Sequence, residues 1–254
     1  MRLLCWCDGT VVEASQFEAK CPYVMQRIHT LGYQPYHLSR HLAQITEATE
    51  ELFRFATLCK VVDAERIIKK LLEISRVTPS LSIPVVMRIE ASGRLSFEVE
   101  SPSYNDGYYL RASRLTPAML NMRLPDYWHQ SSVTEAMDAM ADSMALSRGG
   151  DTAIWIDEYG DVVSRPWHPI FAVYRDNVYT PEEYESVEYM VVKEAVARAN
   201  LKLIIRAIPC ESLARMEELF VADAMGISAF SVIKNHKLLS VAATRIADQM
   251  KLVK

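Results

Sequence analysis

Apolar positions either alternate with polar ones or cluster between turn signals in the first part of the chain. Residues 3–12 are mostly apolar and contain Asp8-Gly9, which predicts a hairpin turn between two strands. Residues 23–30 alternate enough for another strand, and residues 31–35 supply the glycine and proline that end it. We therefore expect the fold to open with a hairpin and a further strand.

Helical spacing replaces this alternation from Leu38 onward. Two consecutive helices are predicted, with apolar faces made by Leu38, Leu42, Ile45, Leu52 and Phe53 and by Ile67, Ile68, Leu71, Leu72 and Ile74. Three strands are expected next, over residues 83–90, 95–100 and 108–114, because glycine turns separate these runs. This order of strands and helices indicates an α+β domain.

The second half of the chain mixes helical and extended patterns. Helices are predicted over residues 133–146, 181–200 and 211–216 and from Val241 onward, and strands over residues 152–156, 170–174, 177–179, 201–208 and 230–233 and around Phe220. Between the halves, residues 117–130 contain two prolines and no clear period, which is typical of a linker. We expect an N-terminal α+β domain over residues 1–116, an interdomain linker over 117–130 and a C-terminal domain over 131–254.

Composition narrows the class of protein. With 50% hydrophobic and 24% charged residues, the chain is that of an ordinary globular protein, and its net charge of -4 offers no basic field to nucleic acid. The sequence has no run of about eighteen apolar residues and no signal-peptide core, so we expect a cytoplasmic protein without a membrane segment. Its five cysteines form no CxxC pair and are expected to be reduced thiols.

Three stretches together resemble one family. Residues 23–42 contain a strand with an arginine, a turn and two His-Leu pairs at a helix start. Residues 150–160, followed by 170–173 and 178–181, hold a strand, a second strand ending in Ile-Phe-Ala-Val and a Val-Tyr-Thr-Pro turn. Residues 217–227 read EELFVADAMGI. In this order and spacing they resemble the class IV aminotransferases, which depend on pyridoxal phosphate (PLP).

The resemblance covers nearly the whole chain and implies a fold as well as an activity. It implies the two-domain fold type IV, with a small N-terminal α+β domain and a larger C-terminal domain built on a mixed sheet. The late stretch is closer to the aminodeoxychorismate lyase branch, which is related to the D-amino acid aminotransferases, than to the branched-chain transaminases. The family also implies a homodimer and a small-molecule site in the cleft between the domains.

The functional residues of the family do not carry over. The Schiff-base lysine of the family falls at or near Ser131, and no lysine occurs between Lys70 and Lys193. The other positions that the resemblance places in the cleft, as sites of ligand contact, are Arg27, Arg40, Gln44, Ser164, His168 and Ala224. Gln44 stands where the family has a phosphate-binding arginine, Ser164 where it has the glutamate beside the pyridine nitrogen, and Ala224 where it has a phosphate-binding threonine. The asparagine that follows this glutamate in the family falls on Pro169.

These replacements remove chemistry that the cofactor needs. A lysine both holds PLP as an imine and moves the substrate proton, and a serine hydroxyl does neither well. A carboxylate keeps the pyridine nitrogen protonated, whereas a serine supplies no charge. Gln44 can offer only a neutral hydrogen bond to a phosphate, and Arg40, one turn earlier, is either a substitute or a solvated surface residue. We therefore expect no catalytic residue and no bound PLP.

Further candidates have simple alternatives. His37 and His41 are four apart, a spacing that can hold a metal, but no third ligand is evident and we expect no metal site. Trp167 and His168 either fill the space of the cofactor ring or contact a ligand. The aromatic residues Tyr104, Tyr108, Tyr109, Tyr127 and Trp128 could line a pocket or cover a dimer surface. The methionines at 137, 140 and 144 indicate core packing.

Three functional hypotheses remain. The preferred one is a homodimer without covalent PLP chemistry that binds a small ligand or serves as a scaffold. The second is an active PLP-dependent aminotransferase or 4-amino-4-deoxychorismate lyase with an atypical site, in which PLP is held non-covalently or Lys193 or Lys202 supplies the amine. The third is a lysine-independent enzyme with His129 or His168 as general base.

Overall fold

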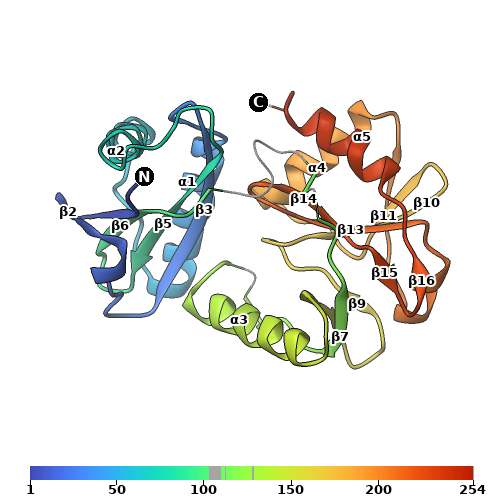
Figure 1. Cartoon of the computed structure of the whole chain (residues 1–254). Helices are drawn as coiled ribbons and strands as arrows, with labels where there is room; N and C mark the ends of the chain where they lie inside the picture. The colour runs from blue at the N-terminus through green and yellow to red at the C-terminus, as the bar shows by residue number, and fades with distance from the viewer. Residues whose placement is uncertain (103–109, 112, 128, 254) are drawn as a thin grey trace. The chain divides into compact units, whose positions relative to one another are not determined.

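The computed structural model describes residues 1–102, 110–111, 113–127 and 129–253, and the chain divides into two compact units. Unit 1 comprises residues 1–107, 129–134 and 254, and unit 2 comprises residues 108–128 and 135–253. Figure 1 shows the elements of both units along the chain. The strands of each unit pair within that unit, and each unit has its own buried apolar residues, so each is described separately.

Unit 1 is built on a six-stranded antiparallel sheet in the order β2-β1-β6-β5-β3-β4. Its strands are β1 (Leu4–Cys7), β2 (Thr10–Glu13), β3 (Tyr23–Leu31), β4 (Gln34–Pro35), β5 (Ile83–Glu90) and β6 (Leu95–Val99), with a 3-10 turn at Ala14–Gln16. The hairpin of β1 and β2 turns at Asp8 and Gly9, both with positive φ, as the sequence predicts.

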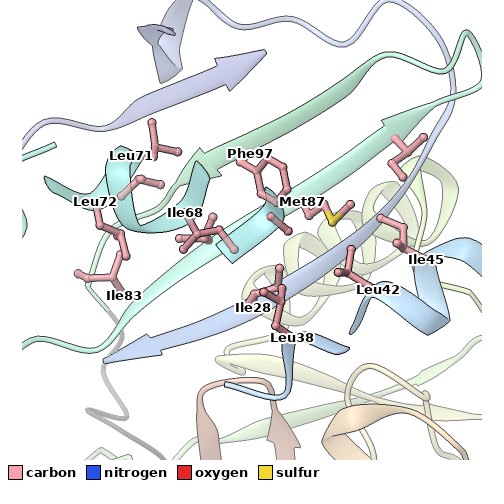
Figure 2. Packing of buried hydrophobic residues seen from close by; sticks show 14 of the residues in the cluster. Ile28, Leu38, Leu42, Ile45, Ile68, Leu71, Leu72, Ile83, Met87 and Phe97 are labelled. Carbon is pink, nitrogen blue, oxygen red and sulfur yellow. The ribbon is translucent and has the colours of Figure 1, made fainter. Parts of the chain in front are cut away.

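Helices α1 (Leu38–Phe53) and α2 (Val61–Ile74) pack on the same face of this sheet. Figure 2 shows side chains of both helices, among them Leu42, Ile45 and Ile68, meeting Met87 and Phe97 of the strands. Alternate strand residues face this layer because successive side chains in a strand point to opposite faces. The same alternation leaves charged residues on the other face of the sheet, where Arg88 pairs with Glu98.

The described residues of unit 2 form three smaller sheets. The largest has the order β12-β11-β10-β13-β14, and its β11 and β12 run parallel while the other pairs are antiparallel. The strands of the unit are β7 (Pro117–Asn121), β8 (Thr152–Ile156), β9 (Val162–Val163), β10 (Ile170–Tyr174), β11 (Asn177–Thr180), β12 (Lys202–Ile205), β13 (Glu218–Asp223), β14 (Gly226–Ala229), β15 (Val232–Ile233) and β16 (His236–Lys237). The mixed sheet confirms the predicted α+β fold class.

The helices that accompany these strands are α3 (Ser132–Ser147), α4 (Val187–Arg198) and α5 (Val241–Met250), with a 3-10 helix at Cys210–Arg215. The first three residues of α3 fall in unit 1 and the rest in unit 2. Among the described residues, no helix is both long enough and apolar enough to cross a membrane.

Several predicted boundaries differ from the structure. The helix expected over residues 181–200 begins only at Val187, because Ser186 caps it by accepting a hydrogen bond from the Tyr189 amide. The strand expected over residues 201–208 is limited to β12, and β14 was not predicted at all. Residues 117–121, expected in the linker, form β7. Of the strand expected over residues 108–114, residues 108, 109 and 112 lie outside the described residues, and Leu110 forms an isolated parallel bridge with Ile227.

The buried face of α2 provides a test of this packing. Ile68 is fully buried, and replacing it with alanine should lower the free energy of unfolding by about 2–5 kcal/mol, because the substitution leaves a cavity. Val62 lies on the same helix with 74% of its surface exposed, so Val62→Ala should cost no more than about 0.5 kcal/mol. Urea unfolding of both variants measures the difference, and equal losses would contradict the packing described here.

Candidate functional site

The segment around Ser131 continues the sheet of unit 1. The Met25 amide donates to the Gln130 carbonyl at 2.9 Å, and Val24 forms an antiparallel bridge with Ser131. The Tyr23 amide donates to the Ser132 hydroxyl at 3.4 Å. The position where the family resemblance places an amine is therefore fixed against the start of β3.

The side chain of Ser131 is used to begin helix α3. Its hydroxyl accepts from the Thr134 amide at 3.4 Å, while the Ser131 amide donates to the Thr134 hydroxyl at 2.8 Å. The Thr134 hydroxyl donates in turn to the Ser131 carbonyl at 3.0 Å. Both residues are buried, so this reciprocal pair satisfies polar groups that have little access to water. Ser131 is thus explained as a helix cap.

The cationic residues predicted in unit 1 have different environments. Arg27 on β3 makes a two-pronged ion pair with Glu100, with N···O distances of 3.0 and 3.1 Å, so its guanidinium fork already holds a carboxylate. Arg40 is exposed in the first turn of α1, whereas Gln44 one turn later is buried. The idea that Arg40 substitutes for an arginine at position 44 therefore has no support from burial.

Two histidines of unit 1 are buried and paired with neutral groups. His41 Nδ1 lies 2.7 Å from Gln26 Oε1, and His29 Nε2 lies 2.7 Å from the Ser82 hydroxyl. Burial lowers the pKa of both imidazoles to about 3, with a smaller effect from the nearby His37. Within the described ranges, no group of three or more histidine, cysteine or carboxylate side chains could hold a metal ion. The ring of His41 is thus held inside unit 1 by its contact with Gln26.

His129, one of the two general-base candidates, lies in unit 1. Its ring is buried, and Nε2 lies 2.7 Å from Glu51 Oε2. The pair ties the segment before α3 to helix α1.

Ser164 in unit 2 organises the turn between β9 and β10. Its hydroxyl accepts from the Ile170 amide at 3.2 Å, and its carbonyl accepts from the Tyr184 hydroxyl at 2.8 Å. Burial, together with the hydrogen bond to Glu182, raises the pKa of the Tyr184 phenol, which stays neutral. Ser164 is buried and brings no charge to the position where the family resemblance places a carboxylate.

Asp138 on α3 is the centre of a polar cluster in unit 2. It pairs with Arg165 and accepts from the Trp167 indole nitrogen at 2.6 Å, and His168 Nδ1 lies 3.9 Å away. The Arg165 guanidinium lies over the Trp155 ring, 4.8 Å from its centroid. Asp138 and Arg165 therefore fix the loop that carries the two aromatic candidates.

The cluster lines a pocket of about 310 Å³ that lies wholly within unit 2. Charges of both signs line it, because Arg111 and three further aspartates, Asp142, Asp151 and Asp223, join Asp138, Arg165 and His168. The volume is at the lower end for a small-ligand site. The sequence pattern indicates His168 but not Asp138 or Arg165. Asp138 is one of three acidic residues in α3, with Glu135 and Asp142, so its position in the helix did not distinguish it.

The turn that contains Ala224 is closed by its own carboxylate. Asp223 Oδ1 accepts from the Met225 amide at 2.7 Å and from the Gly226 amide at 3.0 Å. Amides arranged in this way could bind an anion, but here the adjacent carboxylate accepts from both of them. Ala224 itself is buried and has no polar side-chain group.

These residues do not fit covalently held PLP. The Ser131 hydroxyl takes part in capping, Ser164 supplies no carboxylate, and a fixed negative charge at Asp223 opposes a phosphate at the Ala224 turn. Arg27, Arg40, Gln44 and Ser131 lie in unit 1, and Ser164, His168 and Ala224 lie in unit 2. Within unit 2, the structure brings Ser164 and His168 into one turn. Tyr104, Tyr108, Tyr109 and Trp128 lie outside the described residues.

Comparisons with known proteins bear on the fold. The chain matches no model of a protein family and no curated protein. It is similar to the solved branched-chain aminotransferase of Thermoproteus uzoniensis, with 17% identity, a TM-score of 0.79 and coverage of 99% of this chain and 94% of that one. A PLP-bound aminotransferase from Brucella abortus gives 14% identity, a TM-score of 0.81 and coverage of 99% and 98%.

The Escherichia coli branched-chain amino acid aminotransferase gives 12% identity, a TM-score of 0.76 and coverage of 97% and 92%. At these identities, the likeness shows that the chain has the fold of the class IV aminotransferases, as the sequence stretches predict. It does not assign an activity, because one fold hosts many functions.

The buried histidines predict an acid-sensitive fold. Their pKa values are about 3 when folded but 6.5 when unfolded, so the unfolded chain binds more protons as the pH falls below 6.5. Between pH 6.5 and 5, each histidine should remove roughly 1 kcal/mol of unfolding free energy per pH unit. Chemical denaturation at a series of pH values measures the slope.

A matched pair of variants tests whether His41 contributes to the slope of unfolding free energy against pH. His41→Gln removes a buried titrating group and should flatten the dependence by about one proton, whereas His236→Gln, at an exposed position, should leave it unchanged. Equal slopes in the wild type and His41→Gln would contradict the assignment.

Proposed function

We propose that the chain is a class IV aminotransferase-like protein that has lost covalent PLP chemistry and binds a small polar ligand. The observation that carries the proposal is Ser131, which stands where the resemblance places the lysine and whose hydroxyl is used to cap α3. No lysine between residues 70 and 193 is available to replace it. The homodimer, a scaffolding role and the cytoplasmic location remain predictions.

The polar pocket of unit 2 supports a ligand with both donors and acceptors. Asp138 and Arg165 neutralise each other there, and Asp223 is engaged by turn amides. Asp142 accepts from Thr152, and Asp151 accepts from the Thr116 amide, through one oxygen each. Their other oxygens, together with Arg111, favour a small ligand that carries an amine and an acceptor group.

The enzyme alternative depends on a lysine from elsewhere. Lys193 lies on α4 and pairs with Glu183, and Lys202 is exposed on β12, the edge strand of its sheet. Neither residue lines the polar pocket. No observation favours this alternative, and the experiment described next tests it together with the proposal.

The test is the absorption spectrum of the protein with one equivalent of PLP, before and after borohydride reduction. We expect the spectrum of free PLP and, after reduction, only traces of label spread over surface lysines. The proposal is contradicted by a stoichiometric visible adduct that peptide mass mapping places on one lysine. Lys193→Arg and Lys202→Arg are matched variants that keep the positive charge, so loss of such an adduct in either would identify the amine.

A further inference from the structure

A groove in unit 1 lies where the sheet extends past helix α2. Val11 on β2 pairs with Trp6 on β1, and Trp6 pairs with Phe97 on β6, so the three side chains form a row on one face. Phe97 is fully buried, Trp6 is partly buried and Val11 is 40% exposed. The side chains of this row therefore become more exposed to solvent toward the edge strand β2.

The groove between the row and the helix has a volume of about 410 Å³. On the helix side, Ile67, Leu71 and Ile74 line it, and Gly9 at the hairpin turn leaves one end without a side chain. Ile74 is 40% exposed, like Val11 on the opposite wall. The size suits a small molecule with an apolar body, since comparable sites in proteins begin at about 300 Å³.

The charges that line the groove are both positive. Arg66 and Lys70 lie four residues apart on α2, so their side chains share the face that borders the groove. Arg66 pairs with Asp63 at 2.8 Å through one terminal nitrogen, which leaves further donors on its guanidinium. Lys70 is in no ion pair among the described residues, and no carboxylate residue lines the groove.

We infer that this groove binds a small amphipathic anion, with its apolar body against Trp6 and Val11 and its acidic group at Lys70 and Arg66. Charge complementarity selects the anion, because the chain as a whole is negative while this groove is positive. The site lies within unit 1 and involves none of the residues that support the proposed function. Ligand binding in this groove can therefore be tested separately from the proposed function.

The probe for this site is 8-anilinonaphthalene-1-sulfonate, an aromatic anion whose fluorescence rises in an apolar environment. We expect saturable binding at one site per chain, and displacement by 2-naphthoate but not by the neutral 2-naphthalenemethanol. Lys70→Glu should weaken binding by about tenfold or more, because it reverses a charge at the acidic group. Lys69→Glu is the matched control, since Lys69 is on the same helix, pairs with Glu65 and does not line the groove.

A second pair of variants tests the apolar wall without changing charge. Val11→Trp should fill the groove and abolish binding, while Thr10→Trp on the opposite face of the same exposed strand should leave it intact. Thermal unfolding confirms that each variant is folded. The inference is overturned by an absence of saturable binding, by equal effects of the two lysine variants, or by binding that survives Val11→Trp. The inference is also overturned if the protein self-associates through this groove and thereby excludes the probe. Light scattering would then show a mass that depends on protein concentration.

Discussion

Buried polar groups must find hydrogen-bond partners, and at the candidate positions of each unit those partners come from the same unit. Ser131 and Thr134 satisfy each other at the start of α3. Asp223 accepts from the amides of its own turn, and Arg27 holds Glu100 in a two-pronged ion pair. Each of these contacts engages a residue at or beside a position where the family resemblance implies a ligand contact. Contacts within the chain therefore satisfy the polar groups at these positions, in each unit separately.

The sequence predicted the elements whose periodicity is strong and whose ends carry clear signals. Helices α1 and α2 follow from apolar residues at helical spacing, which form one buried face on each helix. Strand β5 follows instead from a short apolar run bounded by turn residues, and it is almost wholly buried. The predicted start of α4 at Pro181 is wrong. A proline is typical of a first helical turn, but the residue that caps α4 is Ser186, five residues later. Strand β14 is only four residues long and carries too little pattern to be recognised.

Sequence patterns predict candidate site positions but not the hydrogen-bond partners of their side chains. The sequence shows a serine at position 131, where the family resemblance implies a lysine, whereas the capping bond between Ser131 and Thr134 depends on where α3 begins. Asp138 and Arg165 are 27 residues apart and meet only because of the packing of α3 against the β9–β10 connection. Long-range polar pairs of this kind leave no periodic signal. The polar pocket of unit 2 therefore became visible only in the folded chain.

The most direct test of the account is the half-reaction of an aminotransferase. The protein would be mixed with PLP and a panel of amino acids, and the formation of pyridoxamine phosphate would be followed by chromatography against PLP alone. We expect no rate above that of the free cofactor, because the proposal has Ser131 in place of the lysine that would hold PLP and move the proton. Saturable acceleration by the protein would contradict it.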